Sequence, residues 1–350
     1  MKEGWNYKKL GDLCQVLDSQ RKPVTKKDRT KGIYPYYGAT GIQDYVDSYI
    51  FDGRFLLVGE DGAKWGASDK TAYIIEGKSW VNNHAHILKV LENVNDRLLE
   101  YYLTFKDLSE YITGAVVPKL TQKALVSIPI PIPPLSEQQH IVEELDLLSS
   151  IIEKKKAQIK ELDNLAQSLF YEMFGDPITN EKGWDVKTWK DVFETKTGKL
   201  NANASTEGGK YPFFTCSKET SYIDTYAFDC EALLLAGNNA SAIYDVKYYK
   251  GKFNAYQRTY ILTIKEGVYP FYKFSLEGKL SFLQSHSLGG LTKYLTMGVL
   301  NGLSFIAPPI SLQQQFASKI EAIEHQKELI KQSIKEVETL FNSRMDYYFN

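Results

Sequence analysis

Apolar residues recur every three or four positions in two long stretches of the chain, from Ile141 to Met173 and from Phe316 to Tyr348. A period of 3.5 residues that holds over more than four heptads is typical of a coiled-coil seam. At about 1.5 Å per residue, helices of about 40 residues would each be roughly 60 Å long. We therefore predict two long helices, at 136–176 and 311–350, that pair as an antiparallel coiled coil.

Two lysines, Lys155 and Lys327, fall on this apolar seam. Polar seam residues typically fix the register and orientation of a coiled coil. The alternative, in which each helix packs separately on its own globular domain, is disfavoured by the length of the seam.

The two predicted helices begin with nearly the same sequence, PLSEQQ at 134–139 and PISLQQ at 309–314. The copies lie 175 residues apart in a chain of 350, which indicates an internal duplication of half its length. Ser136 and Ser311 are candidate N-caps, because Gln139 and Gln314 follow three residues later in the capping-box position.

The segment before each helix has a different pattern, with short β-branched and aromatic runs between glycines. Strands are predicted at 33–37, 49–51, 55–58, 72–75 and 85–88, a helix at 96–111, another from about Thr121, and an extended proline-rich segment at 128–134. The second half repeats these landmarks, with YPFF at 211–214 answering YPYY at 34–37. We predict an α+β fold with a pseudo-twofold repeat: two α/β domains with mixed or antiparallel sheets at 1–135 and 177–310, joined by the helices.

The turns between these landmarks differ in the two halves. The sequence EDGAKW at 60–65 corresponds to GNNASA at 237–242. A repeated scaffold with divergent loops is how one fold comes to bind two different ligands.

Composition narrows the class of protein. The chain is 43% hydrophobic and can fill real cores, and no apolar run approaches the roughly 18 residues of a membrane span. The N-terminus lacks the apolar region of a signal peptide, and three unclustered cysteines suit free thiols in a reducing cytoplasm. The net charge of −1 conceals a division: the two helical segments sum to −6 and the remainder to +5. A basic bias in the globular domains favours a phosphate-bearing partner.

Amide, hydroxyl and basic side chains, which read base edges in DNA, gather in the divergent turns. A basic loop near the N-terminus is better suited to contact phosphates. The candidate DNA-binding residues are Arg21, Lys22, Lys26, Lys27, Arg29, Lys64, Trp65, Asn82, Asn83, His84 and Lys119 in the first half, and Asn201, Asn203, Lys218, Asn238, Asn239, Ser241, Gln257, Arg258 and Lys293 in the second.

Motifs for catalysis do not fit. The chain has neither the [DNS]PP[YF] motif of amino-methyltransferases nor an FxGxG cofactor loop, and GKS at 77–79 lacks the first glycine of a P-loop because Ala72 occupies its place. His84 and His86 share one face of a predicted strand, but without further ligands nearby we predict no metal site. The Glu60–Lys64 turn resembles a fragment of a nuclease site, and a surface turn is the favoured interpretation.

Three features together resemble the specificity subunit of Type I restriction-modification enzymes: PPLSEQQ at 133–139, LFYEMFGD at 169–176 and the whole-chain duplication. The second copy of the motif departs from the family pattern, since Leu312 replaces its glutamate. The resemblance implies a non-catalytic subunit in which two target-recognition domains each read half of a bipartite double-stranded DNA site. It also implies that the helices set the spacing and bind two methyltransferase subunits, that restriction subunits join, and that S-adenosylmethionine, ATP and magnesium belong to these partners and not to this chain.

Partner methyltransferases would flip the target adenine out of the duplex, and half-sites on one face of the DNA would lie about one helical turn, ~34–36 Å, apart. Three alternatives stay open at this point. The first is the recognition subunit of a Type IIB-like enzyme, whose partner both cuts and methylates. The second is a coiled-coil adaptor with two peptide-binding domains, and the third is a nuclease that uses the Glu60–Lys64 turn.

Overall fold

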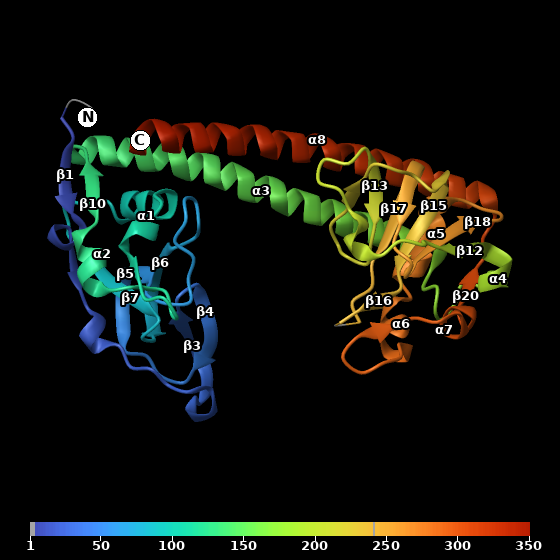
Figure 1. Ribbon diagram of the computed structural model, residues 1–350, viewed down its shortest axis with the longest axis horizontal. Coiled ribbons are helices and arrows are strands. Elements are labelled where there is room, and N and C mark those ends of the chain that lie inside the picture. Colours follow the sequence, from blue (N-terminus) through green and yellow to red (C-terminus); the bar gives the residue numbers. More distant parts are fainter. Residues whose placement is uncertain (1–3, 241) are drawn as a thin grey trace. The chain divides into compact units, whose positions relative to one another are not determined.

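The computed structural model describes residues 4–240 and 242–350, and Figure 1 shows the chain. Its contacts divide the chain into two compact units. Unit 1 joins the residues up to Lys155 with Ser333–Asn350, and unit 2 comprises Lys156–Gln332. Each unit therefore takes one globular part together with portions of both long helices.

Unit 1 is built on a six-stranded mixed sheet in the order β2-β7-β5-β6-β3-β4. Every neighbouring pair is antiparallel except β3 and β6, which run parallel. The separate strands predicted at 49–51 and 55–58 are one strand, β5. The bounds are β2 Cys14–Val16, β3 Lys31–Gly38, β4 Gly41–Val46, β5 Phe51–Gly59, β6 Ala72–Val81 and β7 Ala85–Val90.

Unit 2 repeats this sheet strand for strand in the order β12-β18-β15-β17-β13-β14. Its single parallel pair, β13 and β17, occupies the place of β3 and β6. The predicted duplication and the mixed α+β fold are thereby confirmed. The bounds are β12 Phe193–Thr197, β13 Tyr211–Phe214, β14 Ser221–Ile223, β15 Phe228–Ala236, β17 Val246–Ala255 and β18 Thr259–Ile264.

Short two-stranded ribbons complete each unit. The predicted extended segment at 128–134 forms β10, which pairs with the first strand because its alternate prolines exclude a helix. The ribbons consist of β1 Asn6–Lys9 with β10 Pro129–Ile132, β8 Ile112–Thr113 with β9 Lys119–Leu120, β11 Val186–Thr188 with β20 Ser304–Ile306, and β16 Asn238–Asn239 with β19 Lys293–Tyr294.

Short helices cover the sheets and supply much of the core. In unit 1, Leu98, Leu99 and Tyr102 of α1 are buried. The predicted helix at 96–111 ends at Phe105, because the buried Leu108 draws the chain inward and a separate 3-10 turn follows. The bounds are α1 Asp96–Phe105, α2 Gln122–Ser127, α4 Trp189–Val192, α5 Tyr269–Glu277, α6 Leu280–His286 and α7 Met297–Asn301.

The two long helices are α3, Leu135–Phe174, and α8, Ile310–Phe349. They begin one residue before the serines expected to cap them, so Ser136 and Ser311 are not the caps. A buried glutamine in the first turn of each helix instead joins the helix start to the segments beside it. Gln138 Nε2 donates to the Pro133 carbonyl (3.0 Å) and its Oε1 accepts from the Asn95 N–H (2.8 Å).

Gln313 repeats both contacts in unit 2. Its Nε2 donates to the Pro308 carbonyl (2.9 Å), and its Oε1 accepts from the Val268 N–H (3.2 Å). The first glutamine of the shared QQ is therefore a structural joint that ties each long helix to the globular part beside it.

Contacts between α3 and α8 occur inside each unit and run in opposite order along the two helices, as an antiparallel pair requires. In unit 1, the start of α3 meets the end of α8, where Glu144 is paired with Arg344 (2.6 Å). In unit 2, Lys327 of the seam is paired with Asp163 (2.7 Å), and Phe170 packs edge-on against Phe316. The predicted pairing of the helices is confirmed (Figure 1), and the seam lysine Lys327 is accommodated by an ion pair.

The structure also bears on the GKS sequence, the cysteines and the search for membrane-spanning helices. The GKS sequence at 77–79 lies within β6, where Gly77 pairs with Gly53 of β5, so it is a strand and forms no phosphate loop. All three cysteines are free. Between residues 4 and 350, with residue 241 left aside, no helix has both the length and the apolar character needed to cross a membrane.

Candidate nucleic-acid interface

One end of the unit 1 sheet gathers much of the polar chemistry predicted from the sequence. There β5 ends at Gly59, β7 begins at Ala85, and β9 lies alongside. Two contacts connect the turn after β5 with the turn before β7: the Glu60 N–H donates to the His84 carbonyl (2.9 Å), and His84 Nδ1 contacts the Asp61 carboxylate. We call this end of the sheet, with the turns 60–64 and 82–84 and strand β9, the recognition edge of unit 1.

Beneath this edge lies a buried network of charged side chains. Glu60 is paired with Arg21 (Oε2 to Nη1, 2.5 Å) and with Lys119 (Oε1 to Nζ, 2.7 Å). Asp18 contacts His86 (Oδ2 to Nδ1, 2.5 Å), and the other ring nitrogen of His86 lies 2.7 Å from the Leu120 carbonyl oxygen. The network links the N-terminal loop with the turn after β5, with β7 and with β9.

The ion pairs in this network shift the pKa values of two members. Burial of the Asp18 carboxyl acts to raise its pKa, but the hydrogen bond and charge of His86, with the Ile87 N–H and Arg21, outweigh burial and hold the pKa below its usual value. The hydrogen bond to Glu60 raises the pKa of Lys119. Both groups are therefore held in their charged forms.

Asp18, Glu60 and His86 also have their ligand atoms within 4.8 Å of one another, a spacing that a metal ion could use. The donor set argues for a different role. Arg21 already lies against both carboxylates, at 3.3 Å from Asp18 and 2.5 Å from Glu60, so a second cation would meet its charge. This cluster is a structural ion-pair network.

The turn 82–84 divides into a buried anchor and two exposed side chains. Asn82 is buried; its Nδ2 donates to Gln43 and its Oδ1 accepts from the His84 N–H. Asn83 and His84 are exposed. The structure therefore gives Asn82 the task of shaping the turn that presents its two neighbours.

The predicted basic loop likewise contains both exposed side chains and side chains held by internal contacts. Lys22, Lys26 and Lys27 are exposed, as phosphate contacts require. Arg29 instead stacks on the Tyr36 ring, 4.1 Å from its centroid, and is paired with Asp44 (3.1 Å). Arg21 is held in the buried network, so the two arginines serve to order the loop.

Two neighbouring candidates, Lys64 and Trp65, differ in burial: the first is exposed and the second is buried. Lys64 is exposed in the turn after β5. Trp65 is placed in the core, where its Nε1 donates to the Gly59 carbonyl (3.0 Å). Sequence patterns could not separate these neighbours, because a polar turn and the aromatic residue that anchors it have the same local composition.

Unit 2 presents an equivalent edge with different side chains. The Gly237 N–H donates to the Arg258 carbonyl (2.8 Å), and Gln257 donates to Asn201 (3.1 Å). In β16 and β19, Asn238 is opposite Tyr294 and Asn239 is opposite Lys293. We call this the recognition edge of unit 2: the turn after β15, the turn 256–258 and strand β19.

The remaining candidates of unit 2 are less closely tied to this edge. Asn203 and Lys218 are exposed on loops before and after β13. Ser241 lies outside the described residues.

The same two hydrogen bonds close both edges, although the side chains differ. In unit 1, the Leu120 N–H donates to the Glu60 carbonyl (2.8 Å) and the Leu120 carbonyl contacts His86. In unit 2, the Leu295 N–H donates to the Gly237 carbonyl (2.8 Å) and the Tyr260 hydroxyl donates to the Leu295 carbonyl (2.9 Å). The charged network is specific to unit 1, because a Cβ on Gly237 would lie 2.2 Å from the Arg258 carbonyl oxygen.

Sequence reasoning did not identify four residues of unit 1, Asp18, Gln43, Glu60 and Asp61, as contacts of the recognition edge or of the residues beneath it. One signal was present: Glu60 and Asp61 directly follow the buried run FLLVG of β5. Acids at the end of a buried strand need cationic partners, but those partners are distant in the sequence.

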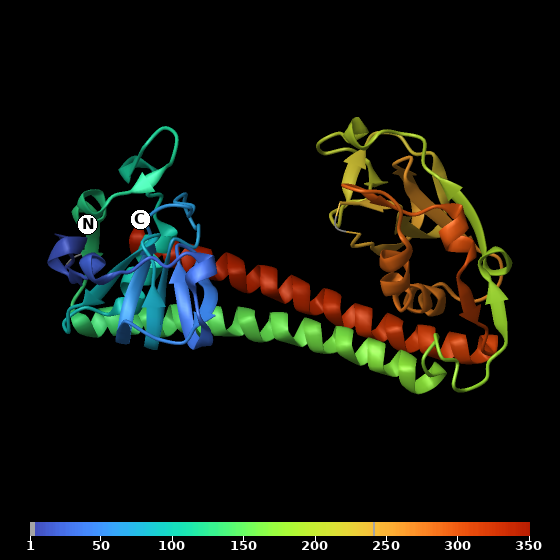
Figure 2. The ribbon, with the colours of Figure 1, turned by 90° about the horizontal axis from the view of Figure 1, so that it is seen from below.

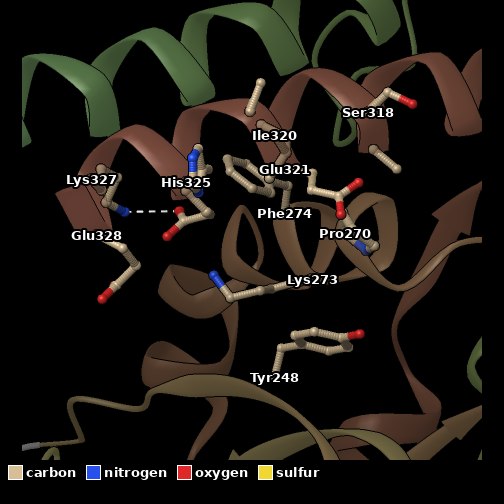
Figure 3. A pocket seen from close by; sticks show the side chains of 13 residues that line it. Tyr248, Pro270, Lys273, Phe274, Ser318, Ile320, Glu321, His325, Lys327 and Glu328 are labelled. Atoms are coloured by element: carbon tan, nitrogen blue, oxygen red, sulfur yellow. Dashed lines mark hydrogen bonds and ion pairs between the residues drawn. The ribbon is translucent and has the colours of Figure 1, made fainter.

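Unit 2 also has a groove lined by both acidic and basic side chains (Figure 3). It has a volume of about 1070 Å³ and lies between α5, α8 and Tyr248 of β17. Its lining includes Glu321, Glu324 and Glu328. One of its two lysines, Lys327, is already paired with Glu324 (2.8 Å), and the dashed line in Figure 3 starts from this lysine. Glu328 is likewise paired with Lys331 (2.6 Å), and Lys273 of the lining is paired with Glu277 (2.6 Å), so acidic and basic side chains offset each other along this groove.

Comparisons with known proteins identify the family of the two repeated domains. The family model of the Type I restriction modification DNA specificity domain matches the chain twice, at residues 2–163 and 181–339. The chain is 41% identical over 145 residues to a protein of Haemophilus influenzae named as a type I restriction enzyme specificity subunit, a match that covers 41% of this chain and 37% of that one. It is 34% identical over 154 residues to the Type I restriction enzyme EcoDI specificity subunit of Escherichia coli, over 44% of this chain and 34% of that one. These matches thus span only about a third of the relatives' length.

Solved structures show the fold over nearly the whole chain. The crystal structure of the Type-I restriction-modification system S subunit from M. genitalium has a TM-score of 0.63 at 13% identity and covers 97% of this chain and 95% of that one. A structure from work on assembly and conformational transition of the type I R-M system has a TM-score of 0.51 at 14% identity, over 100% of this chain and 98% of that one. With two matched domains and the repeated recognition edges, this chain belongs to the family of Type I restriction-modification DNA specificity proteins.

Proposed function

We propose that this chain is the DNA sequence-recognition subunit of a Type I restriction-modification complex and that it catalyses no reaction itself. The observation that carries the proposal is the repeated recognition edge: the same end of the same six-stranded sheet, closed by the same two hydrogen bonds, presents different polar side chains in the two units. Each edge reads one half of a bipartite duplex site. Because the side chains differ, the two half-sites differ in sequence.

The chemistry of each edge suits base recognition. In unit 2, Asn238, Asn239 and Gln257 offer amides, which pair bidentately with adenine. In unit 1, Lys64 and Lys119 offer ammonium groups suited to guanine, and the exposed lysines of the basic loop neutralise phosphates. The candidate residues Asn83, His84, Asn203, Lys218, Arg258 and Lys293 belong to the same proposal.

The long helices have a separate task in this proposal. Their segments carry a net charge of −6, which disfavours a DNA contact and suits protein partners. They bind two methyltransferase subunits, fix the spacing of the half-sites, and admit restriction subunits to a cytoplasmic complex. Residues 1–135 and 177–310 act as recognition domains, and 136–176 and 311–350 as the helical regions. S-adenosylmethionine, ATP and magnesium are held by the partners.

Base-resolution mapping of adenine methylation tests the proposal. The chain is expressed with its methyltransferase, and genomic DNA is mapped for the methylated motif. We expect a gapped motif with two unlike halves. The paired substitution Asn238→Ala and Asn239→Ala should relax one half and leave the other unchanged. An unsplit motif, or none, would overturn the proposal.

Titration with salt separates this function from that of a peptide-binding adaptor. Binding of duplex DNA by the assembled complex should weaken steeply between about 50 and 200 mM salt, because each neutralised phosphate releases counterions. An adaptor shows no such binding. A Type IIB-like enzyme would give the same gapped motif but would cut and methylate with one partner polypeptide, which purification of the complex identifies.

A further inference from the structure

Each unit carries a hairpin beside its recognition edge, at 112–120 in unit 1 and 288–295 in unit 2. In unit 1, β8 pairs with β9 to form the hairpin, which projects from the globular part as the teal loop in Figure 2. In unit 2, the Leu288 and Tyr294 backbones exchange two hydrogen bonds, of 3.0 and 2.8 Å. We call these segments the tip hairpins.

The base of each tip hairpin is fixed to the sheet. Leu120 and Leu295 are buried, and each makes the two hydrogen bonds that close its edge. The next residue, Thr121 or Thr296, caps a helix through its hydroxyl, which accepts from the N–H three residues later. A rigid base of this kind holds the tip in one position.

The turn at each tip is also fixed, and in the same way. Gly114 and Gly289 have φ of +92° and +101°, values that side chains rarely adopt. A Cβ at either position would lie within 2.4 Å of a carbonyl oxygen three residues on, that of Val117 or Thr292. Both tips therefore need glycine and share one backbone conformation.

What these fixed turns present is apolar. Val116 is 93% exposed and Leu291 is 96% exposed, which makes them the most exposed large apolar side chains among the described residues. They occupy the same position of the repeat, 175 residues apart. A single exposed apolar side chain is ordinary on a protein surface, but the same exposure on the same rigid turn in both units indicates a shared ligand.

The neighbours of the tips indicate which ligand. Lys119 and Lys293 follow the two tips, and each lies in a strand of its recognition edge, opposite Asp61 and Asn239 respectively. The apolar residue thus projects next to cationic and amide groups. DNA offers the complement of this pattern, with phosphates outside and apolar base faces within.

We infer that Val116 and Leu291 are apolar wedges that each enter a groove of one half-site and press against a base step. The inference rests on the proposed function and adds to it a contact that reads DNA stacking and deformability in place of base edges. A wedge on a rigid hairpin loses little conformational freedom on binding, so most of the buried area contributes to affinity.

The test uses the complex of the full chain with its methyltransferase and a duplex that carries the mapped motif. Val116→Ser and Leu291→Ser are compared with Ile178→Ser, an exposed isoleucine that follows α3 outside either hairpin. Each tip variant should bind the duplex about tenfold more weakly, as loss of one buried aliphatic side chain predicts, and the double variant about a hundredfold. The Ile178 variant should bind as wild type.

A second measurement reports the wedge directly. 2-Aminopurine replaces an adenine in one half-site at a time, and its fluorescence rises when a neighbouring base unstacks. Wild type should raise the signal in both halves, Val116→Ser only in the half read by unit 2, and Leu291→Ser only in the half read by unit 1.

The outcomes separate the inference from the function on which it rests. If the wild-type complex binds no DNA, the proposed function itself fails. If wild type binds the split motif and both tip variants match it in affinity and fluorescence, the wedge is refuted and the function stands. If the variants bind DNA normally but lose the methyltransferase in size-exclusion chromatography, the tips are protein contacts and the inference is overturned.

Discussion

Removal of one carboxylate, that of Glu60, should destabilise unit 1 while leaving unit 2 intact. The side chain is buried, with the residue only 7% exposed, and its two oxygens contact Arg21 and Lys119 at 2.5 and 2.7 Å. Glu60→Ala leaves the Arg21 guanidinium buried with a single carboxylate partner, Asp18, at 3.3 Å. The strain therefore falls on the residues that hold the recognition edge together.

The magnitude follows from the burial of each partner. Breaking a buried ion pair by removal of one member costs about 3–5 kcal/mol. Two features lower this figure: Arg21 keeps Asp18, and the Lys119 side chain is 42% exposed and can be hydrated. We expect a loss of about 2–4 kcal/mol, which for a unit of this size lowers Tm by on the order of 10 °C.

Differential scanning calorimetry with hydrogen exchange measures the effect. Two units should melt in separable steps, because a chain of two domains need not unfold in one transition. In Glu60→Ala, the amides of β5, β7 and β9 should lose protection while those of β15 and β18 keep theirs. Glu60→Gln keeps the size and hydrogen-bonding capacity of the side chain without its charge, so its Tm should lie between those of wild type and Glu60→Ala.

The matched control is Glu266→Ala in unit 2. Glu266 is also paired with a lysine, Lys187 at 2.8 Å, but both side chains are exposed. Water screens an exposed pair, so this variant should melt almost as wild type. If Glu60→Ala and Glu266→Ala both shift Tm only slightly, burial does not strengthen the Glu60 ion pairs, and the predicted destabilisation of unit 1 is refuted.

Three further predictions concern the helix joints, acid stability and the helical spacer. Gln138→Ala leaves the Asn95 N–H and the Pro133 carbonyl without their partner and should lower the free energy of unfolding in urea by about 2–4 kcal/mol. The control Gln139→Ala, at the exposed neighbouring position, should change it by no more than about 0.5 kcal/mol. Equal losses in the two variants would mean that the joint does not stabilise the fold. The pKa of the Asp18 carboxyl is lowered from 3.8, so its ionised form stabilises unit 1 above that pH and the contribution disappears as the pH falls through the folded-state pKa. Asp18→Asn should therefore be less stable at neutral pH and lose less Tm than wild type between about pH 5 and 3, and parallel curves would contradict this assignment. A seven-residue insertion between Leu148 and Ile159 keeps the heptad phase and should change the spacer of the methylated motif, while a changed half-site would show that the helix is more than a spacer.

The sequence predicted the repeat and the paired helices because both leave a regular spacing of residues: a 175-residue repeat and an apolar residue every three or four positions. A seam at 3.5-residue spacing over more than four heptads favours burial against a second helix and so predicted the pairing of α3 with α8, although its ends, such as Ile141 and Phe316, also pack into the globular cores. The Tyr34 and Tyr211 runs likewise placed the matching strands β3 and β13, since aromatic and β-branched residues fit a pleated, half-buried surface.

The same local patterns could not divide the recognition candidates into exposed and internal ones. Arg29 and Lys27 are near neighbours in one basic loop, yet the first stacks on Tyr36 and the second is exposed. Trp65 follows Lys64 and is in the core. The residue type limits the contacts that a side chain can make. The contacts that it actually makes depend on which residues the fold brings near it.

By itself, the sequence determined the architecture of this protein: two copies of one mixed-sheet domain, two paired helices and polar turns that differ between the copies. The tertiary structure decided how the turns are held. Glu60 meets Arg21 across 39 residues, and Leu120 meets His86 across 34. Such contacts depend on sheet register and strand order, which fix distances between residues remote in sequence. For the same reason, only the structure could show that Val116 and Leu291 project from matching rigid turns beside the two recognition edges.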